Sequence, residues 1–214
     1  MTRLPALRSL VVSTALVATL APLPSQAIEE PAYAVTRTLG DIEVRQYSPY
    51  LVAEVVLSGS ATDAGNDAFR ILAGYIFGKN KGDRTLAMTA PVTQAAVPIR
   101  MDMTAPVTQT ASPDGWVVQF VLPRDVTLGT APKPVDERIK LREVPSQRVA
   151  VIRYSGFWSE ANYDEHLALL RSALQAADLK WSGEPVFSRY NAPFTPWFAR
   201  RNEIWLHLPQ RHPH

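Results

Sequence analysis

The amino-acid sequence predicts an α+β fold made of two similar ββαββ-like units that form a distorted β-barrel or curved sheet flanked by two helices. Three observations predict it. Residues 42–59 and 139–156 align without a gap, an amphipathic helical pattern follows each of these segments, and further strand-like runs follow each helical pattern. The pseudo-repeats span about 32–123 and 136–209 of a single domain, residues 28–214.

Each pseudo-repeat begins with two strand-like runs. The segments are IEVRQYSPYLVAEVVLSG (42–59) and IKLREVPSQRVAVIRYSG (139–156), in which Ile42 matches Ile139. Each has two runs rich in β-forming residues around a polar stretch that contains a proline. This pattern is typical of a β-hairpin, so we expect a hairpin at the start of each repeat.

A helix is predicted after each hairpin from the spacing of its apolar residues. In the first helix these are Ala68, Ile71, Leu72, Tyr75 and Ile76. Thr62 or Asp63 can cap its start, and Gly78 lies near its end. In the second helix the stripe is Tyr163, His166, Leu167, Leu170, Ala173, Leu174 and Ala177. Ser159 can cap this helix, which ends before Trp181.

Strand-like runs follow each helix, and two of those in the first half contain the same heptapeptide, MTAPVTQ, at 88–94 and 103–109. Proline cannot donate to a sheet ladder, so the proline of each copy belongs at a strand end, an edge or a bulge. Two interpretations remain open. Either both copies make the same bend at a barrel corner, or Met88 and Met103 offer polarizable surface to a bound ring.

The first 27 residues have the three-part layout of a secretory signal peptide. Arg3 and Arg8 precede an uncharged apolar run, and the small residues Ser25 and Ala27 stand at the −3 and −1 positions of a cleavage site. The apolar run is shorter than the roughly 20 residues that a membrane-spanning helix needs. We therefore expect cleavage after Ala27, a mature chain without a stable membrane anchor, and a periplasmic or secreted location.

Composition excludes several classes of function. The chain has 22 Lys+Arg and 20 Asp+Glu, and since the leader holds two arginines and no acid, the mature part has no net charge. The sequence has no run of basic residues of the kind that indicates a nucleic-acid partner. The absence of cysteine from the sequence excludes a thiol nucleophile, a thiolate metal site and covalent haem attachment. HExxH, GxSxG and Walker motifs do not occur in the sequence.

Several segments together make the chain similar to the SOUL haem-binding protein family. They are IEVRQYSP, FGKNKGDRTLAMTAPV, the second MTAPV, VPSQRVAVIRYSGFWSEANY and YNAPFTPWFARRNEIWL, in that order over residues 32–208. The resemblance implies a distorted β-barrel with two long helices, built by duplication. It also implies non-covalent binding of haem or another tetrapyrrole in an apolar cleft beside the first helix. Similar folds serve as small-molecule effector-binding domains.

The chain departs from this family at positions concerned with iron. One branch of the family has a proposed histidine ligand where this chain has Gln46, and an amide is a poor ligand for iron. The basic residues that are proposed to meet the haem propionates along the first helix are not clearly kept, and this chain offers Arg70 in the helix with Lys79 and Lys81 just beyond it. The resemblance therefore implies haem as the cofactor and leaves its axial ligand open.

The first helix has a wider apolar surface than packing on a sheet requires. Phe69, Ala73 and Phe77 extend its apolar face on one side. Either a neighbouring loop covers this flank, or the flank is one wall of an apolar cleft for a flat macrocycle. On the second interpretation the expected haem contacts are Phe69, Arg70, Leu72, Ala73, Ile76, Phe77, Lys79 and Met88.

Two further groups of residues have alternative interpretations. His166 lies within the apolar arc of the second helix and is either a hydrogen-bonded core residue, the commoner case, or an axial iron ligand. In residues 200–203 (RRNE), an arginine either pairs with Glu203 or another acid across the two halves, or binds a carboxylate of a ligand.

These features predict an exported, non-enzymatic protein that binds haem or another tetrapyrrole and carries, buffers or scavenges it. One alternative is an enzyme that modifies a tetrapyrrole. Another is a domain that binds a different small apolar molecule as an effector-binding or scaffold module. Turnover of a bound pigment to a spectrally new product distinguishes the enzyme from the carrier.

Overall fold

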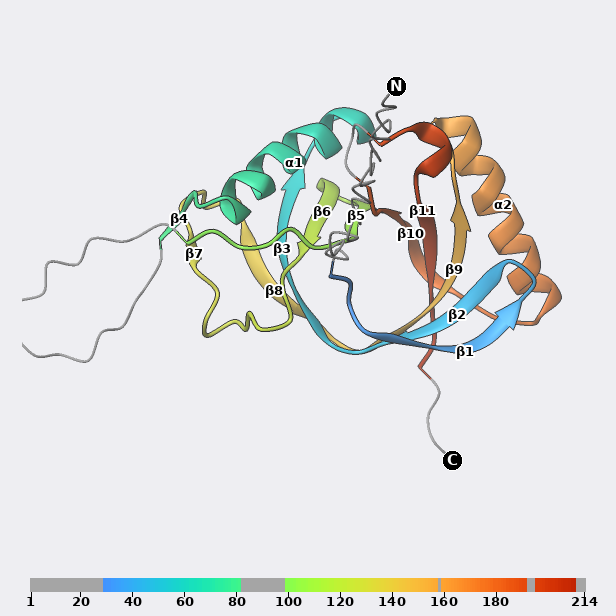
Figure 1. The fold of residues 1–214 in the computed structure, drawn as a ribbon. Helices are drawn as coiled ribbons and strands as arrows, with labels where there is room; N and C mark the ends of the chain where they lie inside the picture. The colour runs from blue at the N-terminus through green and yellow to red at the C-terminus, as the bar shows by residue number, and fades with distance from the viewer. Residues whose placement is uncertain (1–28, 82–98, 158, 192–194, 211–214) are drawn as a thin grey trace, which may run out of the picture.

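The structure, a computed structural model, describes residues 29–81, 99–157, 159–191 and 195–210. In this part of the chain, nine antiparallel strands form one strongly curled sheet, and two α-helices pack against it (Figure 1). The sheet curls into a half-barrel. The predicted α+β class, with a curved sheet flanked by two helices, is confirmed.

The two helices are α1 (Ala61–Ile76) and α2 (Glu160–Ala176). The strands of the large sheet are β1 (Tyr33–Leu39), β2 (Ile42–Tyr47), β3 (Tyr50–Leu57), β5 (Val107–Ser112), β6 (Gly115–Val121), β8 (Lys140–Val144), β9 (Gln147–Tyr154), β10 (Ser182–Arg189) and β11 (Asn202–Leu208). They lie in the order β1-β2-β9-β11-β10-β5-β6-β3-β8. The short strands β4 (Asn80–Lys81) and β7 (Lys133–Pro134) pair separately, and a 3-10 helix, η1 (Trp197–Ala199), precedes β11.

The two predicted hairpins are wrong, although all four of their strands are present. β2 pairs with β9 rather than with β3, and β3 pairs with β8. The register continues unchanged from the pair Tyr47–Gln147 to the pair Tyr50–Val144. The two segments therefore form one long antiparallel ribbon that bends with the curl of the sheet. The bend lies at the proline-containing polar stretches, because proline interrupts the ladder.

The strand order is symmetric about the boundary between β5 and β10. Outward from this boundary, β5, β6, β3 and β8 on one side correspond to β10, β11, β9 and β2 on the other. The first half of the chain thus contributes β2, with β1 beyond it, to the strands of the second half, and the second half contributes β8 to those of the first, so the two halves interlock. This arrangement is compatible with two ββαββ units, while the duplication itself stays a prediction from the sequence.

Helix α1 forms at the predicted place but has a different N-cap. The cap is Ser60, whose hydroxyl accepts a hydrogen bond from the backbone N–H of Asp63 at 3.1 Å, rather than Thr62 or Asp63. The helix contacts β3 and β6 and contributes to the core beneath it. Its buried residues are Ala64, Gly65, Ala68, Leu72, Ala73, Tyr75 and Ile76.

Helix α2 is capped as predicted by Ser159, whose hydroxyl accepts from the backbone N–H of Asn162 at 3.2 Å. It contacts β9 and β11 and fully buries only three of its residues, Leu167, Leu170 and Leu174. Burying a leucine side chain stabilises the fold by about 1.5–3 kcal/mol. The three leucines therefore hold α2 to the sheet, while the rest of its predicted stripe is less buried.

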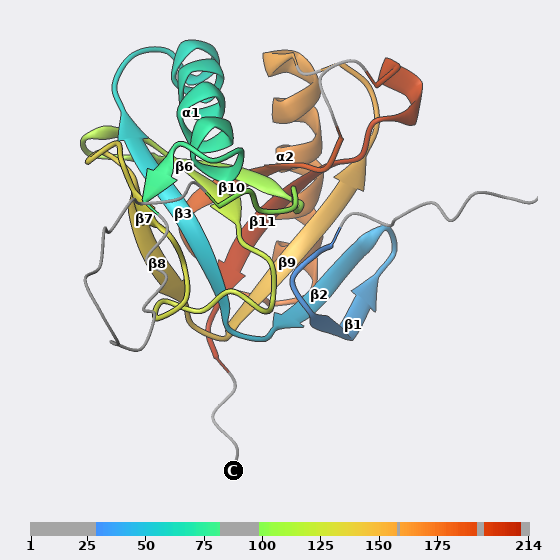
Figure 2. The ribbon, with the colours of Figure 1, turned by 60° about the vertical axis from the view of Figure 1, so that its left-hand side comes forward.

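Both helices lie on one face of the sheet and diverge from their N-terminal ends, which lie near each other (Figure 1, Figure 2). Because side chains alternate along a strand, Ile204 of β11 packs under α2 whereas Trp205 points to the opposite face. On that opposite face Trp205 stacks on Tyr47, with ring centroids 5.0 Å apart. The N-terminal segment, residues 29–32, contacts this face, where the backbone carbonyl of Glu29 accepts from the N–H of Ala105 at 2.9 Å.

The second MTAPVTQ copy is described by the structure, and its proline, Pro106, directly precedes β5 as predicted. Met103 is half-buried and packs against the core under α1. The first copy, including Met88, and the predicted leader lie outside the described residues. Among the described residues, no helix is long and apolar enough to cross a membrane.

Candidate functional site

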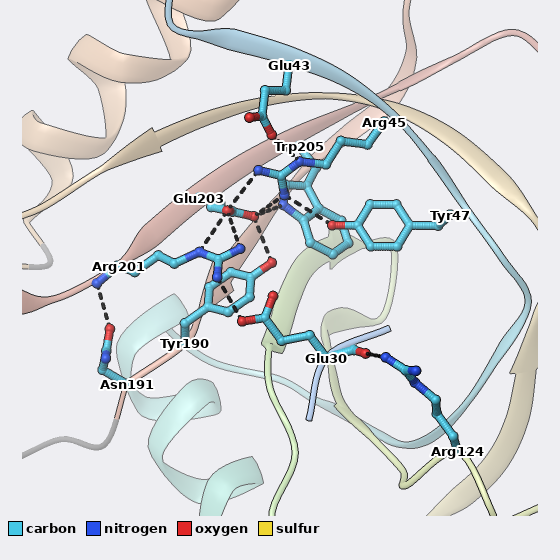
Figure 3. A network of polar contacts seen from close by, with 10 residues as sticks. All are labelled: Glu30, Glu43, Arg45, Tyr47, Arg124, Tyr190, Asn191, Arg201, Glu203 and Trp205. Atoms are coloured by element: carbon cyan, nitrogen blue, oxygen red, sulfur yellow. Dashed lines mark hydrogen bonds and ion pairs between the residues drawn. The ribbon is translucent and has the colours of Figure 1, made fainter. Parts of the chain in front are cut away.

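A fully buried carboxylate, Glu203, lies at the centre of a polar network on the face opposite the helices (Figure 3). Arg45 of β2 donates to both of its oxygens, from Nη1 to Oε2 at 2.9 Å and from Nη2 to Oε1 at 3.2 Å. The side chain of Arg45 is itself only 3% exposed. This is a buried bidentate ion pair, the geometry for which guanidinium and carboxylate groups are best matched.

Three other side chains also donate to Glu203. They are the hydroxyl of Tyr190 at 2.7 Å, Nε1 of Trp205 at 2.9 Å and Nε of Arg201 at 3.0 Å. Burial alone would raise the pKa of Glu203, but Arg45, Arg201 and these hydrogen bonds hold it below its ordinary value. Because donors occupy both oxygens and arginines balance the charge, Glu203 has a structural role rather than that of a free general base.

Arg201 extends the network to the N-terminal segment, since its Nη1 donates to Oε1 of Glu30 at 2.7 Å. Of the two alternatives for residues 200–203, pairing with Glu203 is therefore the one found for Arg201. Arg45 makes a further contact between distant parts of the chain through Glu203, and sequence reasoning missed it. The available signal was a charged residue in the middle of a predicted strand, because such a charge needs a partner when it is buried.

A cavity of about 660 Å³ opens beside α2, near the end of β9 and close to η1. We call it the α2 cavity, and its lining includes Arg153, Tyr154, His166, Leu169, Phe198 and Arg200. The side chains of Arg45 and Arg201 also border it, so the cavity extends around the end of β9 from the helix face to the face that carries the polar network. Its volume lies within the range of about 300–1,000 Å³ that is usual for small-molecule sites.

His166 is a half-buried residue of the α2 cavity and does not belong to the fully buried core. Its Nδ1 lies 2.7 Å from the backbone carbonyl oxygen of Asn162. Its ring stacks on that of Tyr154, with centroids 4.2 Å apart and an angle of 18° between the planes. The predicted hydrogen bond of His166 is thus present, but its imidazole ring also borders a cavity.

A second cavity, of about 250 Å³, lies between α1, β5 and the segment before β11. We call it the α1 cavity, and its lining includes Phe69, Val107, Val118, Arg189 and Arg200. The ring of Phe69 packs on that of Phe120 with centroids 5.4 Å apart. Burial lowers the pKa of Arg189 to about 10. None of the described residues that line this cavity is a histidine, methionine or tyrosine, so they offer iron no ligand.

A third cavity, of about 470 Å³, lies between the N-terminal ends of the two helices. Trp116, Tyr163 and Phe187 give it aromatic walls, and Glu160 and Asp164 give it negative charge. These carboxylates disfavour a ligand that itself carries carboxylates. In the described part of the chain, no group of three or more His, Asp or Glu side chains could hold a metal ion.

The predicted haem contacts on α1 do not form one surface. Leu72, Ala73 and Ile76 belong to the core that α1 forms with β3 and β6. Ala73 is 8% exposed and therefore lies within the packing arc rather than beyond it. Phe69 lines the α1 cavity, whereas Phe77 is 50% exposed at the end of the helix.

A loop covers part of the predicted flank. In residues 99–103, the backbone N–H of Met101 donates to the carbonyl of Ile76 at 2.9 Å, and the guanidinium of Arg100 lies 5.2 Å from the ring centre of Phe77. This favours the loop over the cleft at the C-terminal end of α1. Arg70 and Lys79 are exposed, and Arg70 pairs with Asp67. A contact of any of these residues with haem stays a prediction.

Comparison with known protein families assigns nearly the whole expected mature chain to a family. The family described as "SOUL heme-binding protein" matches residues 28–207. Among curated proteins, Heme-binding protein 2 of Homo sapiens is 28% identical over 189 residues, which cover 85% of this chain and 87% of that protein. Heme-binding protein 1 of Sus scrofa is 33% identical over 150 residues, which cover 67% of this chain and 71% of that protein.

Solved structures share the fold at much lower sequence identity. A structure described as a hydrolase from Listeria innocua has a TM-score of 0.54 and 14% identity, and the match covers 79% of this chain and 92% of that one. The C-terminal domain of EcmrR has a TM-score of 0.51 and 9% identity, with 79% and 98% covered. At such identities the likeness concerns the fold alone.

Proposed function

Because the chain belongs to the SOUL heme-binding protein family, we propose that it binds haem or a related tetrapyrrole non-covalently. The observation that carries this proposal is the family match over residues 28–207, which covers nearly all of the expected mature chain. The sequence has no cysteine to form a thioether link, so the ligand is held by contacts only.

The cavities differ in how well they suit such a ligand. Haem combines a flat apolar ring with two carboxylates and an iron ion. Arginines line both the α1 cavity and the α2 cavity, and a guanidinium suits a carboxylate. The cavity between the helix ends carries two carboxylates instead. When bound, haem would supply the iron ion, and the chain's own residues would supply apolar contacts, charge and orientation.

We propose further that the mature chain carries, buffers or scavenges the tetrapyrrole and does not convert it. The lack of common catalytic motifs in the sequence supports this role. The ion pairs of Glu203 with Arg45 and Arg201 also support it, because they make this buried carboxylate unavailable for proton transfer. If bound pigment is converted during incubation with oxygen and a reductant into a product with a new absorption spectrum, the enzymatic alternative holds.

Export is part of this proposal. The signal-peptide pattern of residues 1–27 supports it, and Glu29, two residues after the expected cleavage site, already contacts Thr104 and Ala105 of the folded domain. Intact-mass measurement of the protein from the periplasm or medium should give a chain that starts at Ile28. A chain that retains Met1 in the cytoplasm would contradict export and leave haem binding untouched.

Haem binding is tested by purifying the mature chain from a haem-replete host and recording its absorption spectrum and the mass of any bound pigment. We expect a Soret band that co-elutes with the protein, and saturable binding with a stoichiometry of one when the haem-free protein is titrated with ferric haem. Serum albumin added in equal amount serves as a competitor for loosely held haem. A protein that leaves the column colourless and binds ferric haem without saturation would refute the proposal.

A further inference from the structure

From the geometry of the α2 cavity, we infer that haem binds there with Nε2 of His166 as an axial iron ligand. This inference rests on the proposed function and adds the position and the ligand. It differs from the expected cleft on α1, which the core packing of Leu72, Ala73 and Ile76 and the loop at residues 99–103 largely occupy.

The hydrogen bond of His166 settles which ring nitrogen can bind iron. Nδ1 lies 2.7 Å from the carbonyl oxygen of Asn162, and since a carbonyl only accepts, Nδ1 carries the proton. In a neutral imidazole the other nitrogen, Nε2, then has a free lone pair. Histidines that bind metals are commonly held in this way, with the second nitrogen donating to a backbone carbonyl. In the described part of the chain, Nε2 has no hydrogen-bond partner.

The orientation of the ring is fixed before any ligand arrives. It stacks on Tyr154 at a centroid distance of 4.2 Å, and the side chain of Tyr154 is 7% exposed, so it cannot swing away freely. The carbonyl of Asn162, one turn earlier in α2, holds the ring at its Nδ1. A ligand whose geometry is set in advance loses less conformational entropy on binding.

The charges around the cavity suit the carboxylates of haem. Arg45, Arg153, Arg200 and Arg201 line it, against the acids Asp41 and Glu43. Arg45 already pairs with both Glu43 and Glu203, and Arg201 with Glu203. Arg153 is exposed and, among the described residues, has neither an ion pair nor a side-chain hydrogen bond. Arg153 is therefore the cation most available to a carboxylate.

Exposed apolar side chains lie at the same place. Leu169 is 53% exposed and Phe198 67% exposed, and both line the cavity. Phe198 continues into a cluster of exposed rings, because it contacts Trp197 at 5.7 Å between centroids and Trp197 stacks on Phe157 at 5.9 Å. Contiguous exposed apolar surface commonly marks a binding site, and a flat macrocycle would remove part of it from water.

The decisive experiment compares His166→Ala with wild type in the mature chain. His212 and His214 are replaced by alanine in every sample, so that the tail cannot collect iron. We expect His166→Ala to bind ferric haem at least tenfold more weakly and to show a shifted Soret band and an altered spin state by electron paramagnetic resonance. Free imidazole added to this variant should restore the wild-type spectrum. Affinity for iron-free protoporphyrin should change less than twofold.

Three further variants serve as controls. His207→Ala removes a half-buried histidine of β11 that does not line the cavity, and should leave the haem spectrum unchanged. His166→Phe keeps a flat ring against Tyr154 and lacks the ligand, so it distinguishes loss of iron binding from loss of folding, as circular dichroism will report. Arg153→Glu should weaken haem binding severalfold without moving the Soret band.

The possible failures are distinguishable. If folded His166→Ala or His166→Phe binds ferric haem with the wild-type affinity and spectrum, the inference is overturned, and the proposed haem binding stands with another site. If the wild-type chain itself binds no haem saturably, the proposed function fails together with the inference. If imidazole does not restore the spectrum of a folded variant that has lost it, His166 positions the site and is not the ligand, which also overturns the inference.

Discussion

Arg45 on β2 and Glu203 on β11 form a buried bidentate ion pair although 158 positions of sequence separate them. Their strands are not neighbours, since β9 lies between β2 and β11. The arginine therefore reaches across a whole strand to the carboxylate. A buried pair of this kind costs solvation on both sides and is compensated only when the geometry and the additional hydrogen bonds are good. Here Tyr190, Trp205 and Arg201 supply those additional bonds.

The first prediction concerns the loss of this carboxylate. Glu203→Ala should lower the free energy of unfolding by about 3–5 kcal/mol, because it leaves the charge of Arg45 buried without its partner. Urea denaturation followed by circular dichroism measures this value. The matched control is Arg142→Ala, which removes the exposed arginine of the ion pair between Arg142 of β8 and Glu54 of β3. In this pair Nε of Arg142 lies 2.9 Å from Oε2 of Glu54. The control should cost less than about 1 kcal/mol, and equal losses in the two variants would refute the prediction.

The second prediction concerns pH. The folded protein holds the pKa of Glu203 below its ordinary value of about 4.5, because the arginines and hydrogen bonds outweigh the effect of burial. A group whose pKa is lowered by folding stabilises the protein above its unfolded pKa, and this stabilisation is lost as the pH falls toward the folded pKa. The stability difference between wild type and Glu203→Gln should therefore be constant from pH 7 to about 5 and should shrink below about 4.5. A difference that grows on acidification would contradict this assignment.

The third prediction uses two glycines of the same helix. A Cβ at Gly74 would meet only the side chain of Lys79, at 3.1 Å, and exposed Lys79 can move. Gly74→Ala should therefore stabilise the protein by about 0.5–1 kcal/mol through helix propensity. A Cβ at Gly65 would lie 2.8 Å from Oε1 of Gln109, a buried side chain whose Nε2 donates to the carbonyl of Ala61 at 2.7 Å.

Gly65→Ala should thus be destabilising by about 1 kcal/mol, because the broken buried hydrogen bond outweighs the gain in helix propensity. The two variants carry the same substitution in α1, so each is the control for the other. Thermal denaturation of both, at one protein concentration, gives the comparison. Stabilisation by both would show that Gln109 moves without cost.

The fourth prediction concerns Ala73, which the sequence suggested as part of a cleft wall. Since Ala73 packs in the core under α1 and is 8% exposed, Ala73→Trp should overpack that core and lower stability by about 1–3 kcal/mol or more. Phe69→Ala removes a ring that lines the α1 cavity, so it tests whether haem binds in that cavity. If haem binds in the α2 cavity, both folded variants keep wild-type haem affinity. A folded Ala73→Trp variant with wild-type stability and weakened haem binding would indicate that haem binds beside α1 instead.

The class of fold and most of its elements could be predicted because they depend on local patterns. Ser159 is followed by apolar residues at helical spacing, and α2 begins directly after it. The alternation of NEIWLHL likewise predicts a strand, and β11 spans it. The choice of Thr62 or Asp63 as the first cap failed because several residues near a helix start can cap it. Only the backbone path selects Ser60.

The site could be predicted only in part. The sequence placed His166 on the apolar face of α2 and gave an ion pair with Glu203 or another acid as one of two interpretations of residues 200–203. It did not indicate that the ring of His166 borders a cavity, because this depends on where η1 and β9 lie beside the helix. It also left open whether Ala73 is covered, because the other members of its core cluster, such as Met101 and Val118, come from other parts of the chain.

By itself, the sequence determined the α+β class, the positions of both helices and of most strands, the family and the absence of thiol chemistry, since each of these follows from residue types and spacing. The tertiary structure decided which strands pair, that β2 and β3 continue one bent ribbon with β8 and β9, and that Arg45 meets Glu203. The physical reason is that alternation buries one face of a strand without specifying its partner. A partner is chosen by the free energy of contacts between distant segments, and these contacts exist only once the sheet has closed around its core.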